Sequence, residues 1–245
     1  MTSFVLIPGA GGQAWYWHRV TPLLQAAGHD VVAVDLPGDD DKAGWPEYAD
    51  TAVAAAAALR DQDVVVVGQS MGGFTAPLVA TRLAAERIVL LNAMIPAPGE
   101  TGGDWWTRTG QGEAQRDLDR REGRDPDAVF DPRVVFFHDV PAEVTEAGLA
   151  GGREQSGTPF GQPWPLPQWP AIPTRVLAGR DDRLFPPEFQ RRVARERLGL
   201  EVELLPGGHL LALSYPEELA AALLTAPMLA VTTSAIASPS TGVSR

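Results

Sequence analysis

Short apolar runs alternate with longer amphipathic or alanine-rich segments over most of the chain. Runs of four or five residues that are apolar on both faces, rich in β-branched side chains and closed by Pro, Gly or Asp are typical of strands buried in a parallel sheet. We expect six such strands, at 3–7, 31–34, 64–67, 88–92, 174–178 and 202–205. Helices are expected between them, at 15–27, 47–59, 74–83, 187–198 and 216–224. Because each crossover is long enough to be right-handed, the pattern predicts an α/β protein with a mostly parallel, doubly wound sheet.

The regular alternation stops at Ile95. From there to residue 170 the chain is rich in Pro, Gly, Trp and charged residues. This stretch ends in PFGQPWPLPQWP. Because this stretch is too long for a plain loop, we expect a cap at 95–170 with some helix of its own, inserted into a core made of 1–94 and 171–225. The tail at 226–245 has neither helical nor strand periodicity, so we expect it to be loosely docked at most.

A possible nucleophile follows the third expected strand. Gly68-Gln69-Ser70-Met71-Gly72 comes directly after four valines and before an apolar helical stretch. Strand, G-x-S-x-G and helix in this order are typical of a nucleophile elbow, a turn so tight that it exposes the serine hydroxyl above the sheet. The alternative is a glycine-rich turn that happens to contain a serine. The elbow interpretation therefore requires an acid and a histidine further along the chain.

Two later strands end in residues that meet this requirement. The strand at 174–178 leads into Gly179-Arg180-Asp181-Asp182, and the strand at 202–205 leads into Pro206-Gly207-Gly208-His209. Alone, an acidic loop residue is usually solvated and a lone histidine is usually structural. Catalytic groups of parallel sheets gather beyond the carboxyl ends of the strands, where all three residues fall. We therefore expect Ser70, Asp182 and His209 to form a catalytic triad.

The loop after the first strand, Pro8-Gly9-Ala10-Gly11-Gly12, also contains glycines. It could bind a dinucleotide, but it departs from G-x-G-x-x-G at its last position, Ala14, and it lacks the lysine of a P-loop. We expect it to offer a backbone N–H instead. Ala10 is the candidate, and together with the N–H of Met71 it would form an oxyanion hole.

Composition excludes several other functions. The chain has no cysteine, which excludes disulfides and thiolate catalysis, and its four histidines are not spaced as metal ligands. A net charge of −11 argues against binding nucleic acid or an anionic membrane. The start of the chain has no basic or apolar signal region, and no apolar run is long enough to cross a bilayer. We expect a cytoplasmic enzyme that needs no metal or cofactor.

The chain resembles the α/β-hydrolase superfamily, and within it the group of plant methylesterases, hydroxynitrile lyases and bacterial esterases. The resemblance extends from residue 4 to about 224 and is strongest in FVLIPGAGGQAWYWHRVTPLLQAAGHDVVAVDLPG, in GQSMGG and in RDDRLFPPEFQ. The family pattern of Gly, two residues, Asp and a proline four residues on fits Gly179, Asp182 and Pro186. The resemblance therefore implies Asp182, rather than Asp181, as the acid, and an α/β-hydrolase fold with serine esterase activity.

Two positions depart from the family pattern. The first loop of the family usually begins His-Gly, whereas this one begins with Pro8 and Gly9. The lyases of the group have a threonine at the position of Gly9 and a lysine after the catalytic histidine, where this chain has Leu210. A lyase needs positive charge to stabilise departing cyanide, and Leu210 supplies none.

The sequence thus predicts a serine esterase or lactonase that forms an acyl-enzyme with a small apolar or aromatic ester. A hydroxynitrile lyase and a non-catalytic ligand-binding protein with the same fold are the alternatives. Apolar residues of the cap and Leu210 are candidates for the substrate pocket, although each cap residue could instead simply pack: Trp105, Trp106, Phe136, Phe137, Phe160 and Trp164. His138-Asp139 could suggest a second site, but we interpret this pair as part of the cap structure.

Overall fold

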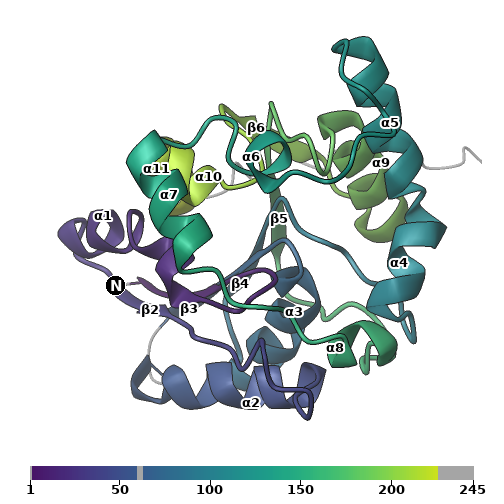
Figure 1. The fold of residues 1–245 in the computed structure, drawn as a ribbon. Helices are drawn as coiled ribbons and strands as arrows, with labels where there is room; N and C mark the ends of the chain where they lie inside the picture. Colours follow the sequence, from purple (N-terminus) through teal and green to yellow (C-terminus); the bar gives the residue numbers. More distant parts are fainter. Residues whose placement is uncertain (1, 60–62, 226–245) are drawn as a thin grey trace, which may run out of the picture.

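A six-stranded sheet forms the centre of the computed structural model, which describes residues 2–59 and 63–225. The predicted tail at 226–245 lies outside the described residues. The strands are β1 (Thr2–Ile7), β2 (Asp30–Ala33), β3 (Asp63–Gln69), β4 (Arg87–Leu91), β5 (Thr174–Gly179) and β6 (Val202–Leu205). They pair in the order β2-β1-β3-β4-β5-β6, and every pairing is parallel (Figure 1). The predicted six-stranded, doubly wound sheet is confirmed.

Both faces of the sheet are buried, because side chains alternate between two hydrophobic clusters. Val5 and Ile7 of β1 belong to one cluster, whereas Phe4 and Leu6 belong to the other. The valines of β3 alternate in the same way. Since successive side chains of a strand point to opposite faces, an unbroken apolar run is what a sheet covered on both sides requires.

Helices cover each face. The face with Val5 packs against α2 (Trp45–Ala55), α3 (Gly72–Leu83) and α9 (Pro187–Leu198). The face with Phe4 packs against α1 (Thr21–Ala26), α10 (Leu211–Ser214) and α11 (Pro216–Leu224). Within residues 2–59 and 63–225, no helix is long and apolar enough to span a membrane.

The predicted continuous helix at 15–27 is wrong. The chain instead forms a short 3-10 turn, Ala14–Trp17, and α1 begins separately at Thr21. Pro22 lies in the first turn of α1. Because proline has no N–H and its ring clashes with the preceding turn, it is tolerated at a helix start but not in a helix interior. The proline therefore determines where the second segment starts.

Residues 95–170, the cap, lie between β4 and β5 and surround the carboxyl ends of the strands (Figure 1). The cap contains α4 (Gly102–Thr109), α5 (Gln111–Arg121), α6 (Pro132–Val135), α7 (Ala142–Ala150) and α8 (Thr158–Gly161). Two tryptophans anchor it: the indole N–H of Trp105 donates to Ile95 O at 3.1 Å, and that of Trp164 donates to Phe74 O at 3.0 Å. Both donors are buried, so each hydrogen bond satisfies a group that water cannot reach.

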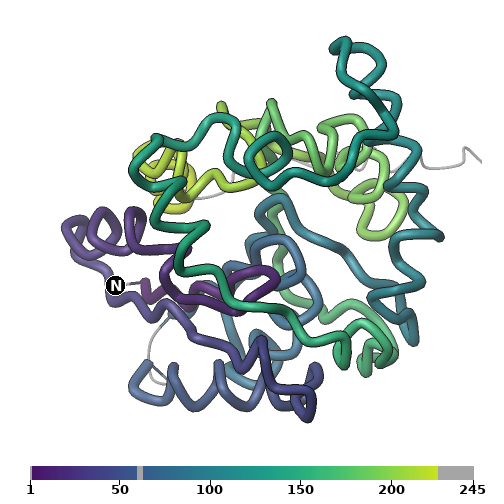
Figure 2. Tube along the Cα trace, viewed as in Figure 1, coloured from purple at the N-terminus to yellow at the C-terminus, as the bar shows by residue number. Residues whose placement is uncertain are grey.

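The segment from α7 to α8 crosses the loops that follow β1 and β2 (Figure 2). Gln155 Oε1 accepts from the Gly11 N–H at 2.9 Å, and its amide nitrogen donates to the Tyr48 hydroxyl at 2.9 Å. The Ser156 N–H donates to Gly38 O at 2.7 Å. The cap is therefore hydrogen-bonded to the same glycine-rich loop that the sequence identified as a candidate oxyanion loop.

A buried ion pair fixes the other end of the cap. The carboxylate of Glu100 is fully buried, and its Oε1 lies 2.9 Å from Arg197 Nη2 on α9. Glu100 Oε2 also accepts from the Ala97 N–H at 3.0 Å. One end of the cap is thus held on α9 and the other on the loop after β1. The part between them lies above the carboxyl ends of the strands.

Candidate active site

Ser70 lies at a strained turn between β3 and α3. Its backbone φ is +51°, in the left-handed region that side chains other than glycine rarely adopt. The turn is tight enough that a β-carbon at Gly72 would lie 2.7 Å from Pro8 O, and one at Gly68 would lie 2.7 Å from Gly72 O. The two glycines therefore allow the close backbone approach that presents the serine hydroxyl above the sheet.

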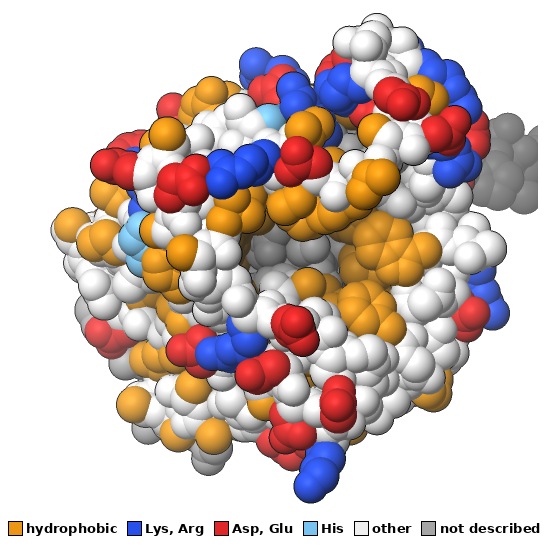
Figure 3. Space-filling view, in the orientation of Figure 1, with side chains coloured by type: hydrophobic (Ala, Val, Ile, Leu, Met, Phe, Trp, Pro, Cys, Tyr) orange, Lys and Arg blue, Asp and Glu red, His pale blue; other side chains and the backbone are white. Residues whose placement is uncertain are grey.

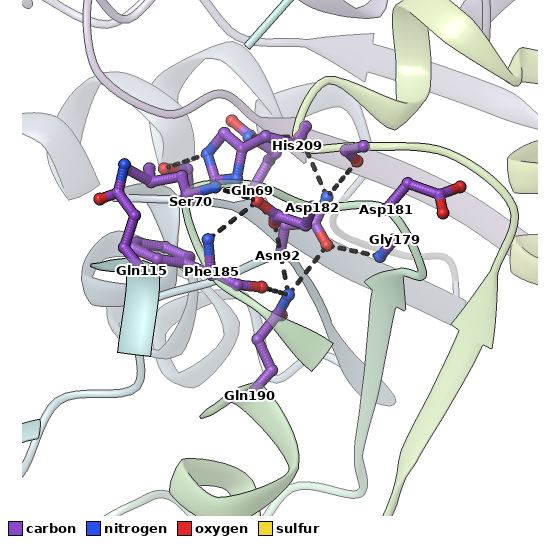
Figure 4. A network of polar contacts seen from close by, with 12 residues as sticks. Gln69, Ser70, Asn92, Gln115, Gly179, Asp181, Asp182, Phe185, Gln190 and His209 are labelled. Carbon is purple, nitrogen blue, oxygen red and sulfur yellow. Dashed lines mark hydrogen bonds and ion pairs between the residues drawn. The ribbon is translucent and has the colours of Figure 1, made fainter. Parts of the chain in front are cut away.

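The three predicted triad residues are linked by hydrogen-bond distances (Figure 4). Ser70 Oγ lies 3.1 Å from His209 Nε2, and His209 Nδ1 lies 2.9 Å from Asp182 Oδ2. The side chains of His209 and Asp182 are 2% and 0% exposed. Because a carboxylate only accepts hydrogen bonds, Asp182 favours the proton on Nδ1 and leaves the Nε2 lone pair free to accept the Ser70 proton.

Asp182 and its neighbour Asp181 occupy very different environments. Asp182 Oδ1 accepts from the N–H groups of Leu184 and Phe185 at 2.9 and 2.8 Å, which fixes the orientation of its carboxylate. Asp181 is exposed, and its Oδ2 lies 3.3 Å from the Gly207 N. The geometry agrees with the family register, because only Asp182 contacts the imidazole.

Asn92, which the sequence did not single out, connects three strand ends. It follows β4 directly, is fully buried and has a φ of +45°. Its Oδ1 accepts from the Gly179 N–H at 2.7 Å, and its Nδ2 donates to the carbonyls of Gly208 and His209, each at 3.0 Å. A buried side chain that satisfies three backbone groups positions the loops on which they lie. Its place at a strand end was the signal in the sequence.

Gln190 on α9 is a second such residue. Its Nε2 donates to Phe185 O at 2.7 Å and lies 3.3 Å from Asp182 Oδ2 (Figure 4). No local pattern indicated this role, because Gln190 lies among charged residues of an amphipathic helix.

Two aromatic rings pack against the imidazole of His209. Phe136 of the cap stacks on it with ring centroids 5.2 Å apart, and Phe185 meets it edge-on at 5.1 Å. These contacts exclude water from two sides of the ring and restrict its rotation. Phe136, predicted as a pocket residue, therefore lies at the site, although its ring is packed on the histidine.

The two candidate oxyanion donors flank Ser70. Met71 precedes α3, so its N–H belongs to the unsatisfied amino end of that helix. Gly9 is in such close contact with Ser70 that a β-carbon there would lie 2.8 Å from Ser70 Cβ, which brings the adjacent Ala10 beside the serine. Neither N–H donates to another described residue. Both donors thus remain available to an external acceptor.

The cap residues predicted to line a pocket fall into two groups. Trp105 and Trp164 are 0% and 1% exposed, so they pack the cap on the core and offer no surface to a ligand in this structure. For these two residues the pocket prediction is wrong, because their indoles fill the space below the cap and donate to backbone carbonyls. Trp106 and Phe160 are partly buried at the edge of the same cluster.

A small cavity lies next to the triad. Leu210, which follows His209, lines a cavity of about 120 Å³ together with Gly9, Ala10, Trp15 and Phe137. A second hollow opens in the face of the molecule drawn in Figure 3, and hydrophobic side chains line much of its edge. The charged side chains in this view lie mostly farther out.

Metal ligands are not grouped in the structure. Within residues 2–59 and 63–225, no three His, Asp or Glu side chains are arranged to hold a metal ion. His18 and His29 are remote from the triad in sequence. Their Nδ1 atoms are hydrogen-bonded to the backbone carbonyls of Trp15 and Thr2, respectively, both at 2.8 Å.

The chain matches the family model described as "Alpha/beta hydrolase family" over residues 4–222. A pyrethroid hydrolase of Sphingobium wenxiniae is 30% identical over 245 aligned positions, which cover 91% of this chain and 86% of that protein. A crystal structure of polyneuridine aldehyde esterase is similar with a TM-score of 0.74 at 23% identity and covers 91% of this chain and 98% of that one.

A third relative is named as a lyase. An alpha-hydroxynitrile lyase of Arabidopsis thaliana is 35% identical over 103 residues, which cover 38% of this chain and 40% of that protein. Proteins similar to this chain thus include a hydrolase, an esterase and a lyase by name.

Proposed function

We propose that this chain, which belongs to the alpha/beta hydrolase family and is a carboxylic ester hydrolase, cleaves small apolar or aromatic esters or lactones through an acyl-enzyme on Ser70. The observation that carries the proposal is the continuous contact from Ser70 Oγ to His209 Nε2 at 3.1 Å and from His209 Nδ1 to Asp182 Oδ2 at 2.9 Å. Nucleophile, base and orienting acid are arranged for acyl transfer.

In this mechanism His209 takes the proton of Ser70 as the oxygen attacks the ester carbonyl. The imidazolium that forms lies against the Asp182 carboxylate, which stabilises its charge. His209 then returns the proton to the leaving alcohol, and the acyl group remains on Ser70. Water attacks the acyl-enzyme with His209 as base, which releases the acid and restores the serine.

The backbone N–H groups of Ala10 and Met71 bind the oxyanion of each tetrahedral intermediate. Each such donor lowers the barrier by about 3 kcal/mol where single donors have been removed in other enzymes. The amino end of α3 adds its positive dipole end beside Met71.

The cavity beside the triad supports an assignment of the ester's smaller substituent. The cavity beside Gly9, Ala10 and Leu210 has a volume of about 120 Å³. This volume is below the roughly 300–1,000 Å³ of typical ligand pockets, so the cavity suits a small group. We assign it the smaller substituent of the ester, and we assign the apolar-edged hollow of Figure 3 the other one.

Replacing Ser70 with alanine tests the proposal. The variant is expected to lose turnover of p-nitrophenyl acetate and labelling by a fluorophosphonate, with an unchanged circular dichroism spectrum. Labelling of the unmodified protein at Ser70 would also separate a catalytic serine from the non-catalytic alternative. Undiminished ester hydrolysis by Ser70→Ala would refute the acyl-enzyme.

Carbon–carbon lyase activity is the second candidate, supported by the similarity to the alpha-hydroxynitrile lyase. Leu210 provides no charge beside His209, and Lys42 is the only lysine of the chain. A threonine at Gly9 would also displace the nucleophile, because its β-carbon would lie 2.8 Å from Ser70 Cβ. We therefore expect no cleavage of mandelonitrile by the unmodified protein, and a gain in Leu210→Lys only. Rapid cyanide release without ester hydrolysis would favour the lyase.

A further inference from the structure

A dipeptide of the cap, His138-Asp139, contacts both loops that contain the acid and the base. Asp139 Oδ2 accepts from the Gly208 N–H at 2.6 Å, directly before His209. His138 Nε2 lies 3.0 Å from Asp181 O, directly before Asp182. The two side chains are 8% and 17% exposed. Their polar atoms thus face the loop backbones.

His138 Nε2 is a hydrogen-bond donor in this arrangement. A carbonyl only accepts hydrogen bonds, so Nε2 carries a proton and donates to Asp181 O. Burial, together with the positive charge of Arg183, lowers the pKa of His138, and the nearby Asp139 opposes this shift. His138 Nδ1 lies 3.3 Å from Asp139 Oδ1.

Neighbouring contacts hold the same cap segment in place. Arg183 Nη1 donates to Val134 O at 2.9 Å, and Phe136 stacks on the imidazole of His209. A β-carbon at Gly208 would lie 2.6 Å from His138 Cε1, so the loop and the cap are in tight contact. The segment from Val134 to Asp139 therefore bridges loops that the sheet alone places at the ends of two different strands.

We propose that His138 and Asp139 are positioning residues that hold the Asp182 and His209 loops in register, so that seating of the cap determines whether the triad is competent. The inference rests on the proposed ester hydrolysis at Ser70 and adds residues that never touch the substrate. Displacing a catalytic group by about 1 Å costs on the order of 100-fold in rate. Loss of the Gly208 contact, with the rest of the bridge intact, should cost at least about tenfold in kcat.

Three variants test this role with p-nitrophenyl acetate, after Ser70-dependent turnover of the unmodified protein has been established. Asp139→Ala removes the acceptor, Asp139→Asn keeps an oxygen that can accept from Gly208, and Asp127→Ala is the matched control at an exposed aspartate of the cap. Fluorophosphonate titration gives the concentration of competent sites. We expect Asp139→Ala to lower kcat at least tenfold while KM stays within threefold of the unmodified protein. Asp139→Asn should keep most of the kcat, and Asp127→Ala should match the unmodified protein.

A second measurement distinguishes positioning from a general loss of stability. The proton between His209 Nδ1 and Asp182 Oδ2 gives a low-field proton NMR signal when the pair is aligned. We expect this signal to shift or disappear in Asp139→Ala and to persist in Asp139→Asn. If Asp139→Ala does not fold, His138→Leu takes its place, with His138→Gln as the variant that keeps a donor for Asp181 O. An unchanged kcat and NMR signal, with only a lower Tm, would overturn the proposal and leave the esterase assignment intact.

Discussion

The Asp182→Asn substitution tests the triad at the residue whose surroundings are most constrained. Asp182 Oδ1 accepts from the N–H groups of Leu184 and Phe185 at 2.9 and 2.8 Å. An asparagine must keep its only carbonyl oxygen on these two donors. Its amide nitrogen then takes the place of Oδ2, 2.9 Å from His209 Nδ1. Because an amide nitrogen donates, Nδ1 must accept, and the imidazole proton moves to Nε2.

In this tautomer Nε2–H faces Ser70 Oγ, so the base can no longer take the serine proton. The corresponding change in a serine protease lowers kcat about 10⁴-fold, which is about 5 kcal/mol at 1.36 kcal/mol for each factor of ten. We expect a loss of about 10³- to 10⁴-fold here. Asp181→Asn is the matched control: its side chain is exposed and keeps an acceptor for Gly207, so kcat should change less than about threefold.

The assay is steady-state hydrolysis of p-nitrophenyl acetate, with kcat divided by the concentration of folded protein. A loss below tenfold in Asp182→Asn would refute the tautomer argument. So would an equal loss in Asp181→Asn, because that residue does not contact the imidazole.

Three further predictions concern stability. Asn92→Ala removes the partner of the Gly179 N–H and of two loop carbonyls, and at about 1–3 kcal/mol for each buried group it should cost about 3 kcal/mol or more in urea unfolding. Glu100→Gln leaves the Arg197 guanidinium without its buried counter-charge and should cost about 3 kcal/mol. Burial raises the pKa of Tyr16 above its usual 10.0, so the folded state keeps this proton longer than the unfolded chain. The free energy of unfolding should therefore fall above pH 10, and less steeply in Tyr16→Phe, as urea titrations at pH 9 and 11 would measure.

The sequence by itself determined the sheet and which side chains meet at its edge. A run such as the four valines before Gly68 has only one stable environment in water, a strand covered on both faces, and the glycines beside Ser70 permit one sharp turn. Parallel strands direct their carboxyl ends to one edge. The residues that follow β3, β5 and β6 therefore had to meet there, which is why Ser70, Asp182 and His209 could be predicted together.

Local sequence patterns were less informative where tertiary packing or a single residue decides the conformation or the burial of a side chain. The helix expected at 15–27 had the right periodicity, but Pro22 favours a new helix start over a helix interior. The tryptophans at 105 and 164 were equally suited to a pocket or to a core. Only the tertiary structure buried both, because each indole N–H found a backbone carbonyl under the cap.

Contacts between distant segments were decided by the tertiary structure alone. Asn92 and Gly208 are 116 residues apart, and Asp139 and Gly208 are 69 apart. Their hydrogen bonds depend on where the cap and the strand ends meet in space, and the periodicity of either segment contains no information about the other. The sequence therefore determined which groups meet at the edge of the sheet. The tertiary structure determined what holds them at hydrogen-bonding distance, because that support comes from side chains whose partners lie far along the chain.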